Sequence, residues 1–122
     1  MAKGDDIQER LIELAVKTVH LCGTFPKTEA GRHVAGQLLR CGTSPAANYG
    51  EARGAESRND FVHKLGVVLK ELHESAVWLQ IARRSRLIPD ASSQPLLDEC
   101  DQLCRIIGAS IATVGKPLKT RS

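Results

Sequence analysis

Polar side chains at helical spacing are the residues of this sequence best suited to chemistry. Arg40, Ser44, Asn48 and Glu51 are separated by four, four and three positions, which places them on one face of a helix. A second set follows further along the chain at comparable spacing: Lys64, Glu71, Glu74 and Trp78. Two interpretations are open for these sets. They form solvated faces or an ion-pair network between two helices, or they form a surface for another subunit or a ligand.

Pairing of the two polar sets follows if their helices form an antiparallel hairpin. That geometry would bring Ser44 close to Lys64. It would also bring Arg40 close to Glu71 or Glu74. A partly buried Arg–Glu pair adds little net stability, but losing one partner is costly, so such a pair is suited to holding the register of two helices.

The other potentially reactive residues of the sequence do not predict a catalytic or metal centre. Di-metal sites in helical bundles need Glu-x-x-His pairs from two helices and two further glutamates. Only Asp60 and His63 have that spacing, and no second pair matches them. The sequence also lacks a glycine-rich phosphate loop and an HExxH motif. We therefore expect a protein that is not an enzyme, has no cofactor or metal and binds no small-molecule substrate.

The four cysteines favour a reduced, cytoplasmic protein. Cys22, Cys41, Cys100 and Cys104 lie within apolar helical patterns, at spacings typical of neither a zinc ribbon nor a secreted disulfide scaffold. We interpret them as small core residues, although Cys100 and Cys104 could supply half of a metal site. The sequence shows no signal-peptide pattern and no apolar run long enough to span a membrane, so we expect no membrane association.

Clustered basic residues are the candidates for nucleic-acid contacts. One cluster closes the third helical segment and consists of Arg83, Arg84 and Arg86. The other is expected at the opposite end of a bundle and consists of Arg53, Arg58, Lys116, Lys119 and Arg121. Cations at a helix C-terminus also compensate the helix dipole, and a basic tail can be solvated, so neither cluster requires a ligand.

Aromatic residues are scarce, at 3% of the chain. Tyr49 and Trp78 are candidate interface residues, because aromatic side chains are enriched where proteins associate. Each could equally lie at the edge of the protein's own core. With so few aromatics, aliphatic side chains must build that core, which favours packed helices over a sheet sandwich.

Four amphipathic segments position these residues. Apolar positions recur at steps of three and four over residues 5–23, 28–51, 57–86 and 92–115, with Gly and Pro between the segments. Pro45 should kink the second segment. The 122 residues suffice for one domain spanning 1–122, and the net charge of +3 is too small to identify a partner. The prediction is an all-α, up-down-up-down antiparallel four-helix bundle.

Three motifs carry a resemblance to a known family. They are Ser44-x-x-Ala-Asn48-x-x-Glu51, Ser57-x-x-Asp-Phe61 and Glu71-x-x-Glu74-x-x-x-Trp78-Leu. In this order and spacing the chain resembles the bacterial four-helix-bundle family of the 23S ribosomal-RNA intervening-sequence proteins, over essentially residues 7–115. The resemblance implies a bundle that assembles as a ring-like homopentamer. Its relatives include accessory subunits of diversity-generating retroelements, which bind nucleic acid and a reverse transcriptase.

Two functional hypotheses follow. The first is a non-enzymatic, oligomeric interaction or scaffold module whose partner is a second copy of itself. The alternative is an adaptor that binds RNA or DNA, in which a ring of subunits would multiply weak phosphate contacts.

Overall fold

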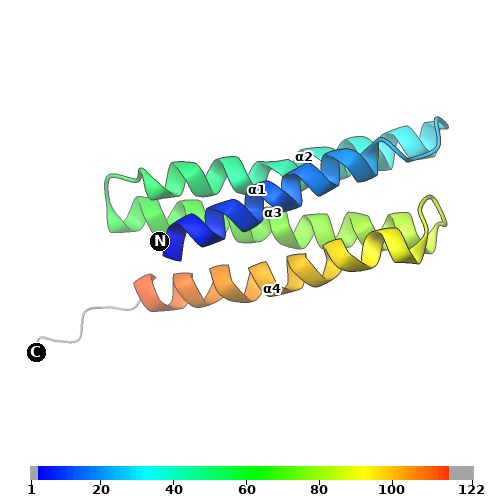
Figure 1. Ribbon diagram of the computed structural model, residues 1–122. Helices are drawn as coiled ribbons and strands as arrows, with labels where there is room; N and C mark the ends of the chain where they lie inside the picture. Colours follow the sequence, from blue (N-terminus) through cyan, green and yellow to red (C-terminus); the bar gives the residue numbers. More distant parts are fainter. Residues whose placement is uncertain (1–2, 116–122) are drawn as a thin grey trace, which may run out of the picture.

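The computed structural model describes residues 3–115, and these form four antiparallel helices (Figure 1). They are α1 (Lys3–Cys22), α2 (Glu29–Arg53), α3 (Arg58–Arg84) and α4 (Asp90–Gly115). Within these residues no strand is present. The all-α bundle is confirmed, and each helix boundary falls within two residues of its predicted position.

Side-chain caps explain where two of the helices begin. The Thr28 hydroxyl accepts a hydrogen bond from the Gly31 amide at 3.1 Å, and α2 starts at the next residue. Similarly, the Ser57 hydroxyl accepts from the Asp60 amide at 3.0 Å, and α3 follows it. Each hydroxyl satisfies a backbone donor that has no partner within the helix. These local signals place the predicted starts correctly.

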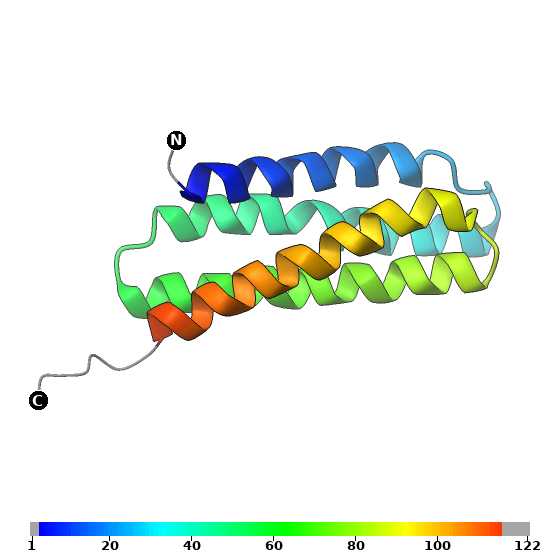
Figure 2. The ribbon, with the colours of Figure 1, turned by 60° about the horizontal axis from the view of Figure 1, so that its bottom comes forward.

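Each helix packs on its neighbour in sequence, and α4 returns to α1. In the described chain the backbones of α1 and α3 do not approach each other closely, so these helices occupy diagonal corners of the bundle. Figure 2 shows α4 running obliquely across the other helices. Arg10 of α1 joins the α1–α4 seam by donating to Glu99 at 2.9 and 2.7 Å and to Gln102 at 3.0 Å.

The core is aliphatic, as the composition predicts. Leucines from all four helices, among them Leu11, Leu38, Leu72 and Leu103, are fully buried. Tyr49 also lies in this core, while Trp78 and Phe61 are half-buried against it. Such burial is the main source of stability in a helical bundle, since isolated helices of this length are marginal in water.

The α1–α2 contact is close because of a glycine. A β-carbon at Gly42 would lie 2.6 Å from Thr18 Cγ2, so only glycine allows the two helices to approach this far. One turn later Pro45 is buried within an uninterrupted α2. The expected kink at Pro45 stays a prediction.

Candidate interaction surfaces

A charged cluster joins α2 to α3 at the position that the sequence predicts. Arg40 donates to Glu71 at 3.1 Å and also to Glu74. The Trp78 indole donates to the same Glu74 carboxylate at 3.1 Å, and its ring meets His33 edge-on at a centroid distance of 5.8 Å. The expected pairing of Arg40 therefore occurs with both glutamates.

The carboxylates of this cluster are occupied by partners within the chain. Glu71 is buried, whereas Arg40 is about half exposed, with 51% of its side chain accessible. The bond from Trp78, together with Arg40, lowers the pKa of Glu74 and keeps it ionised. This arrangement matches an ion-pair network that fixes the register of α2 against α3.

The other residues of the two polar sets make bonds between α2 and α3 or within α2. Lys64 donates to Glu51 at 3.3 Å. The Asn48 amide donates to the Ser44 carbonyl at 3.1 Å, one turn earlier. The Ser44 hydroxyl is buried and has no hydrogen-bond partner within residues 3–115, so it makes no bond to Lys64.

The two aromatic interface candidates have different surroundings. Tyr49 is 5% exposed and packs in the core of its own chain, which is the second of the roles that its sequence position allows. Trp78 is partly exposed beside the charged cluster. Of the two, only Trp78 therefore offers substantial surface to a partner.

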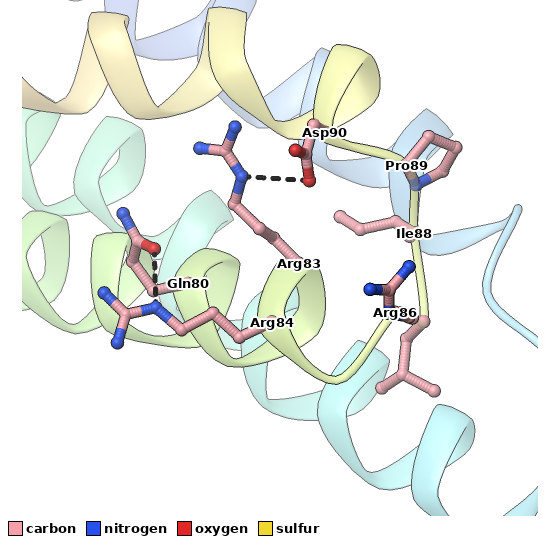
Figure 3. A pocket seen from close by; sticks show the side chains of 8 residues that line it. Gln80, Arg83, Arg84, Arg86, Ile88, Pro89 and Asp90 are labelled. Atoms are coloured by element: carbon pink, nitrogen blue, oxygen red, sulfur yellow. Dashed lines mark hydrogen bonds and ion pairs between the residues drawn. The ribbon is translucent and has the colours of Figure 1, made fainter.

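Three arginines gather where α3 ends and α4 begins, as Figure 3 shows, and we call Arg83, Arg84 and Arg86 the arginine corner. Arg83 donates to Asp90 at 3.2 Å and to Gln94 at 2.8 Å. The corner lines an open cavity of about 760 Å³. The α1–α2 loop lies at the same end of the bundle (Figure 1).

The second basic cluster is only partly described. Arg53 of α2 forms an ion pair with Asp5 at 2.6 Å. Arg58 of α3 donates to the Val114 carbonyl at 2.6 Å, near the end of α4. Because Arg53 ends α2 and Arg58 begins α3, both lie at the α2–α3 turn, which is at the end of the bundle opposite the α3–α4 loop (Figure 1), as expected. The other members of the cluster fall outside the described residues: Lys116, Lys119 and Arg121.

Exposed apolar side chains form a surface that the sequence analysis missed. Ile12, Val16 and Val19 of α1 are 42%, 41% and 49% exposed. Leu39 of α2 is 40% exposed and shares a helical row with Gly42, which faces α1. We call these four residues the α1–α2 ridge. Ile12, Val16 and Val19 are separated by four and three positions, so the sequence does show that they share one helix face. The buried residues of α1 have the same spacing, so the spacing alone does not tell which face is exposed.

A groove of about 730 Å³ lies between α3 and α4 on the opposite side of the bundle. Val77 and Ile81 line it from α3 and are 56% and 40% exposed, and Leu97 lines it from α4. We call it the α3–α4 groove. Its walls are mainly apolar, so it can hold apolar side chains better than a charged ligand.

Burial raises the pKa of all four thiols. Burial raises the pKa of Cys22 to about 11 and that of Cys100 to about 12, so both are protonated near neutrality. Cys104 lies 3.7 Å from a ring nitrogen of His73. Within residues 3–115, no three His, Cys, Asp or Glu side chains are grouped to hold a metal ion. The described helices also include none with the length and apolarity to cross a membrane.

Comparison with known proteins decides the family. Residues 5–109 match the 23S rRNA-intervening sequence protein family. The chain belongs to this family. A similar solved structure is that of a protein of unknown function from the S23 ribosomal protein family of Bacteroides thetaiotaomicron, with 29% identity and a TM-score of 0.84. The match covers 91% of this chain and 99% of that one. Comparison with curated proteins finds no match.

Membership of the intervening-sequence family agrees with the motifs quoted above. The family match spans all four helices, so the charged cluster, the α1–α2 ridge and the α3–α4 groove all lie within it. The relative's unknown function leaves the role of these surfaces to be argued from their own geometry.

Proposed function

We propose that this protein is a non-enzymatic interaction module that assembles with copies of itself. The observation that carries the proposal is the pair of apolar surfaces on opposite sides of one bundle, the α1–α2 ridge and the α3–α4 groove. Soluble monomers seldom expose several large aliphatic side chains together, and such patches mark association sites.

Charge favours contact between the ridge of one copy and the groove of the next. Exposed Glu9 and Glu13 flank the ridge on α1. Exposed Lys70 lies one turn before the groove on α3, and Arg84 lines its other end. Opposite charges around an apolar contact select the correct partner and orientation.

Ridge-to-groove contact would be heterologous, because it joins two different surfaces. Each added copy presents a free ridge or a free groove, so assembly continues until a ring closes. This supports the ring-like homopentamer that the family resemblance implies. In the same proposal the protein is cytoplasmic, which its four free thiols support.

Native mass spectrometry of single variants and their mixture tests this assembly. Wild-type protein should appear as a closed oligomer. Val77→Glu in the groove and Val16→Glu in the ridge should each give mainly monomers, because a charge would enter an apolar contact. An equimolar mixture of the two variants should give one-to-one dimers, since one intact ridge still meets one intact groove.

Ala109→Glu is the matched control, as it adds the same charge at an exposed position of α4 away from both surfaces. It should leave the oligomer intact. A strictly monomeric wild type contradicts the proposal, as does equal disruption by Ala109→Glu.

A nucleic-acid adaptor is a second candidate, favoured by the basic end of the bundle. Arg83, Arg84 and Arg86 meet only one acidic residue, Asp90, along their cavity. A ring would repeat this charge in every subunit, and repeated weak contacts give avidity. Filter binding of structured RNA and duplex DNA across a salt series should show affinity that falls as salt rises. No binding even at low salt would eliminate this candidate.

A further inference from the structure

The arginine corner has the form of a ligand site rather than of a flat basic surface. Its cavity of about 760 Å³ is open to solvent and is lined by all three arginines. Ile88 and Pro89 provide an apolar wall, and Asp90 is the single carboxylate among the lining residues. Three guanidinium groups against one carboxylate leave an excess of positive charge around the cavity.

The end of α3 does not use these guanidinium groups as caps. Its last carbonyls are satisfied by backbone donors, with Arg86 N–H bonded to the Arg83 carbonyl at 3.1 Å and Leu87 N–H bonded to that of Ala82 at 2.9 Å. This pair of backbone hydrogen bonds is a Schellman motif. The side-chain hydrogen bonds of Arg83 and Arg84 instead reach other side chains. Helix capping therefore does not explain the cluster.

Arg86 occupies the position of that motif where glycine is favoured. Its φ of 62° is the only positive value among residues 3–115, and a side chain there is disfavoured by contact with its own backbone. Within the described chain the Arg86 guanidinium takes part in no hydrogen bond or ion pair. A strained residue with an uncommitted charge at a cavity is a mark of a functional position.

We propose that the arginine corner binds phosphate groups. Guanidinium forks match phosphate oxygens in geometry and bind them by charge-assisted hydrogen bonds. Three such groups around one cavity suit a ligand with more than one phosphate, either a free polyphosphate or the phosphodiester backbone of a nucleic acid. The site goes beyond self-association and does not depend on it, because each copy contains all of the residues involved.

Titration of the full chain with inorganic tripolyphosphate at low salt tests the site. The side-chain Nε–H signals of Arg84 and Arg86 should shift in NMR spectra, and sodium chloride of equal ionic strength should not reproduce the shifts. Arg86→Gly should weaken binding by about tenfold or more, the usual scale for a lost charge-assisted contact. The same substitution should raise the thermal unfolding midpoint by about 4 °C, since glycine relieves the backbone strain.

Two further variants separate a site from general electrostatics. Arg86→Lys keeps the charge and should retain more affinity than Arg86→Gly. Arg105→Gln removes a positive charge from an exposed ion pair on α4 and should bind tripolyphosphate as the wild type does. Unchanged binding by Arg86→Gly, or an equal loss in Arg105→Gln, would overturn the proposal.

A parallel titration with a single-stranded RNA oligonucleotide identifies the source of the phosphate. Shifts of the same arginine signals by RNA would identify a phosphodiester ligand. Shifts with tripolyphosphate alone would identify a free polyphosphate, and both results support the site. Binding of RNA without any effect on these signals and without a tripolyphosphate response would overturn it, while leaving a nucleic-acid role through other residues.

Discussion

At the scale of single residues, Arg10 and Glu99 form the charge pair that spans the α1–α4 seam. Both side chains are about one-third exposed, so the pair is worth about 1 kcal/mol or less. The bond from Arg10 lowers the pKa of Glu99 below its ordinary value of 4.5. The pair therefore stabilises the fold above that pH, and the stabilisation is lost as the pH falls through the lowered pKa.

Glu99→Gln should accordingly reduce the free energy of unfolding at pH 7 by up to about 1 kcal/mol. The difference from wild type should persist at pH 5 and shrink toward pH 3, as the pH falls through the lowered pKa of Glu99. Urea unfolding at the three pH values measures it. Arg105→Gln, which removes an exposed i,i+4 partner, serves as a control with little effect. A difference that stays constant down to pH 3 would contradict this account.

Residue pairings were predictable where spacing alone determines them. The bonds of Arg40 follow from an antiparallel hairpin, and the Ser57 cap follows from its position before an apolar period. The left-handed conformation of Arg86 was not predictable, because arginine is an unusual residue there and α3 was expected to continue to 86. A sequence pattern records residue types but not a local φ angle.

At the scale of elements, the approach of α1 to α2 depends on the absence of one side chain. A β-carbon at Gly42 would meet Thr18, whose own side chain is fully buried and bonded to the Leu14 carbonyl at 2.8 Å. The threonine is branched at its β-carbon, so it cannot rotate away freely. Even a methyl group at position 42 would therefore clash with Thr18.

Gly42→Ala should lower the free energy of unfolding by about 1–3 kcal/mol, the usual cost of overpacking a filled core. Gly36→Ala in the same helix should raise it by about 0.5–1 kcal/mol, since no atom lies within 4 Å of the added carbon and alanine favours the helix. Denaturant unfolding of the two variants provides a matched comparison. Equal effects of the two substitutions would show that the close contact is not tight.

Helix boundaries were predictable to within two residues. Which apolar stripe of a helix is buried and which is exposed was not predictable. α1 carries one stripe through Leu11 and Leu14 and a second through Ile12 and Val16, both at helical period. Only packing decides that the first is buried and the second exposed. The exposed ridge was missed for this reason.

At the scale of the whole molecule, the ridge and the groove are separated in space, whereas the groove and the arginine corner adjoin and share Arg84. The α1–α2 ridge and the α3–α4 groove occupy opposite sides, and the arginine corner occupies one end. Assembly through the sides would leave the ends of every copy facing the same way in a ring. The proposed phosphate sites would then form a circle on one face. The sequence predicts two basic clusters at opposite ends of the bundle, and part of the second cluster falls outside residues 3–115.

The single tryptophan of the chain has a consequence for optical spectroscopy. The indole of Trp78 contacts Glu74 and His33, from α3 and α2. Its intrinsic fluorescence therefore comes from one known environment, free of the averaging that several tryptophans cause. Emission intensity and wavelength can follow the separation of α2 from α3 without any attached label.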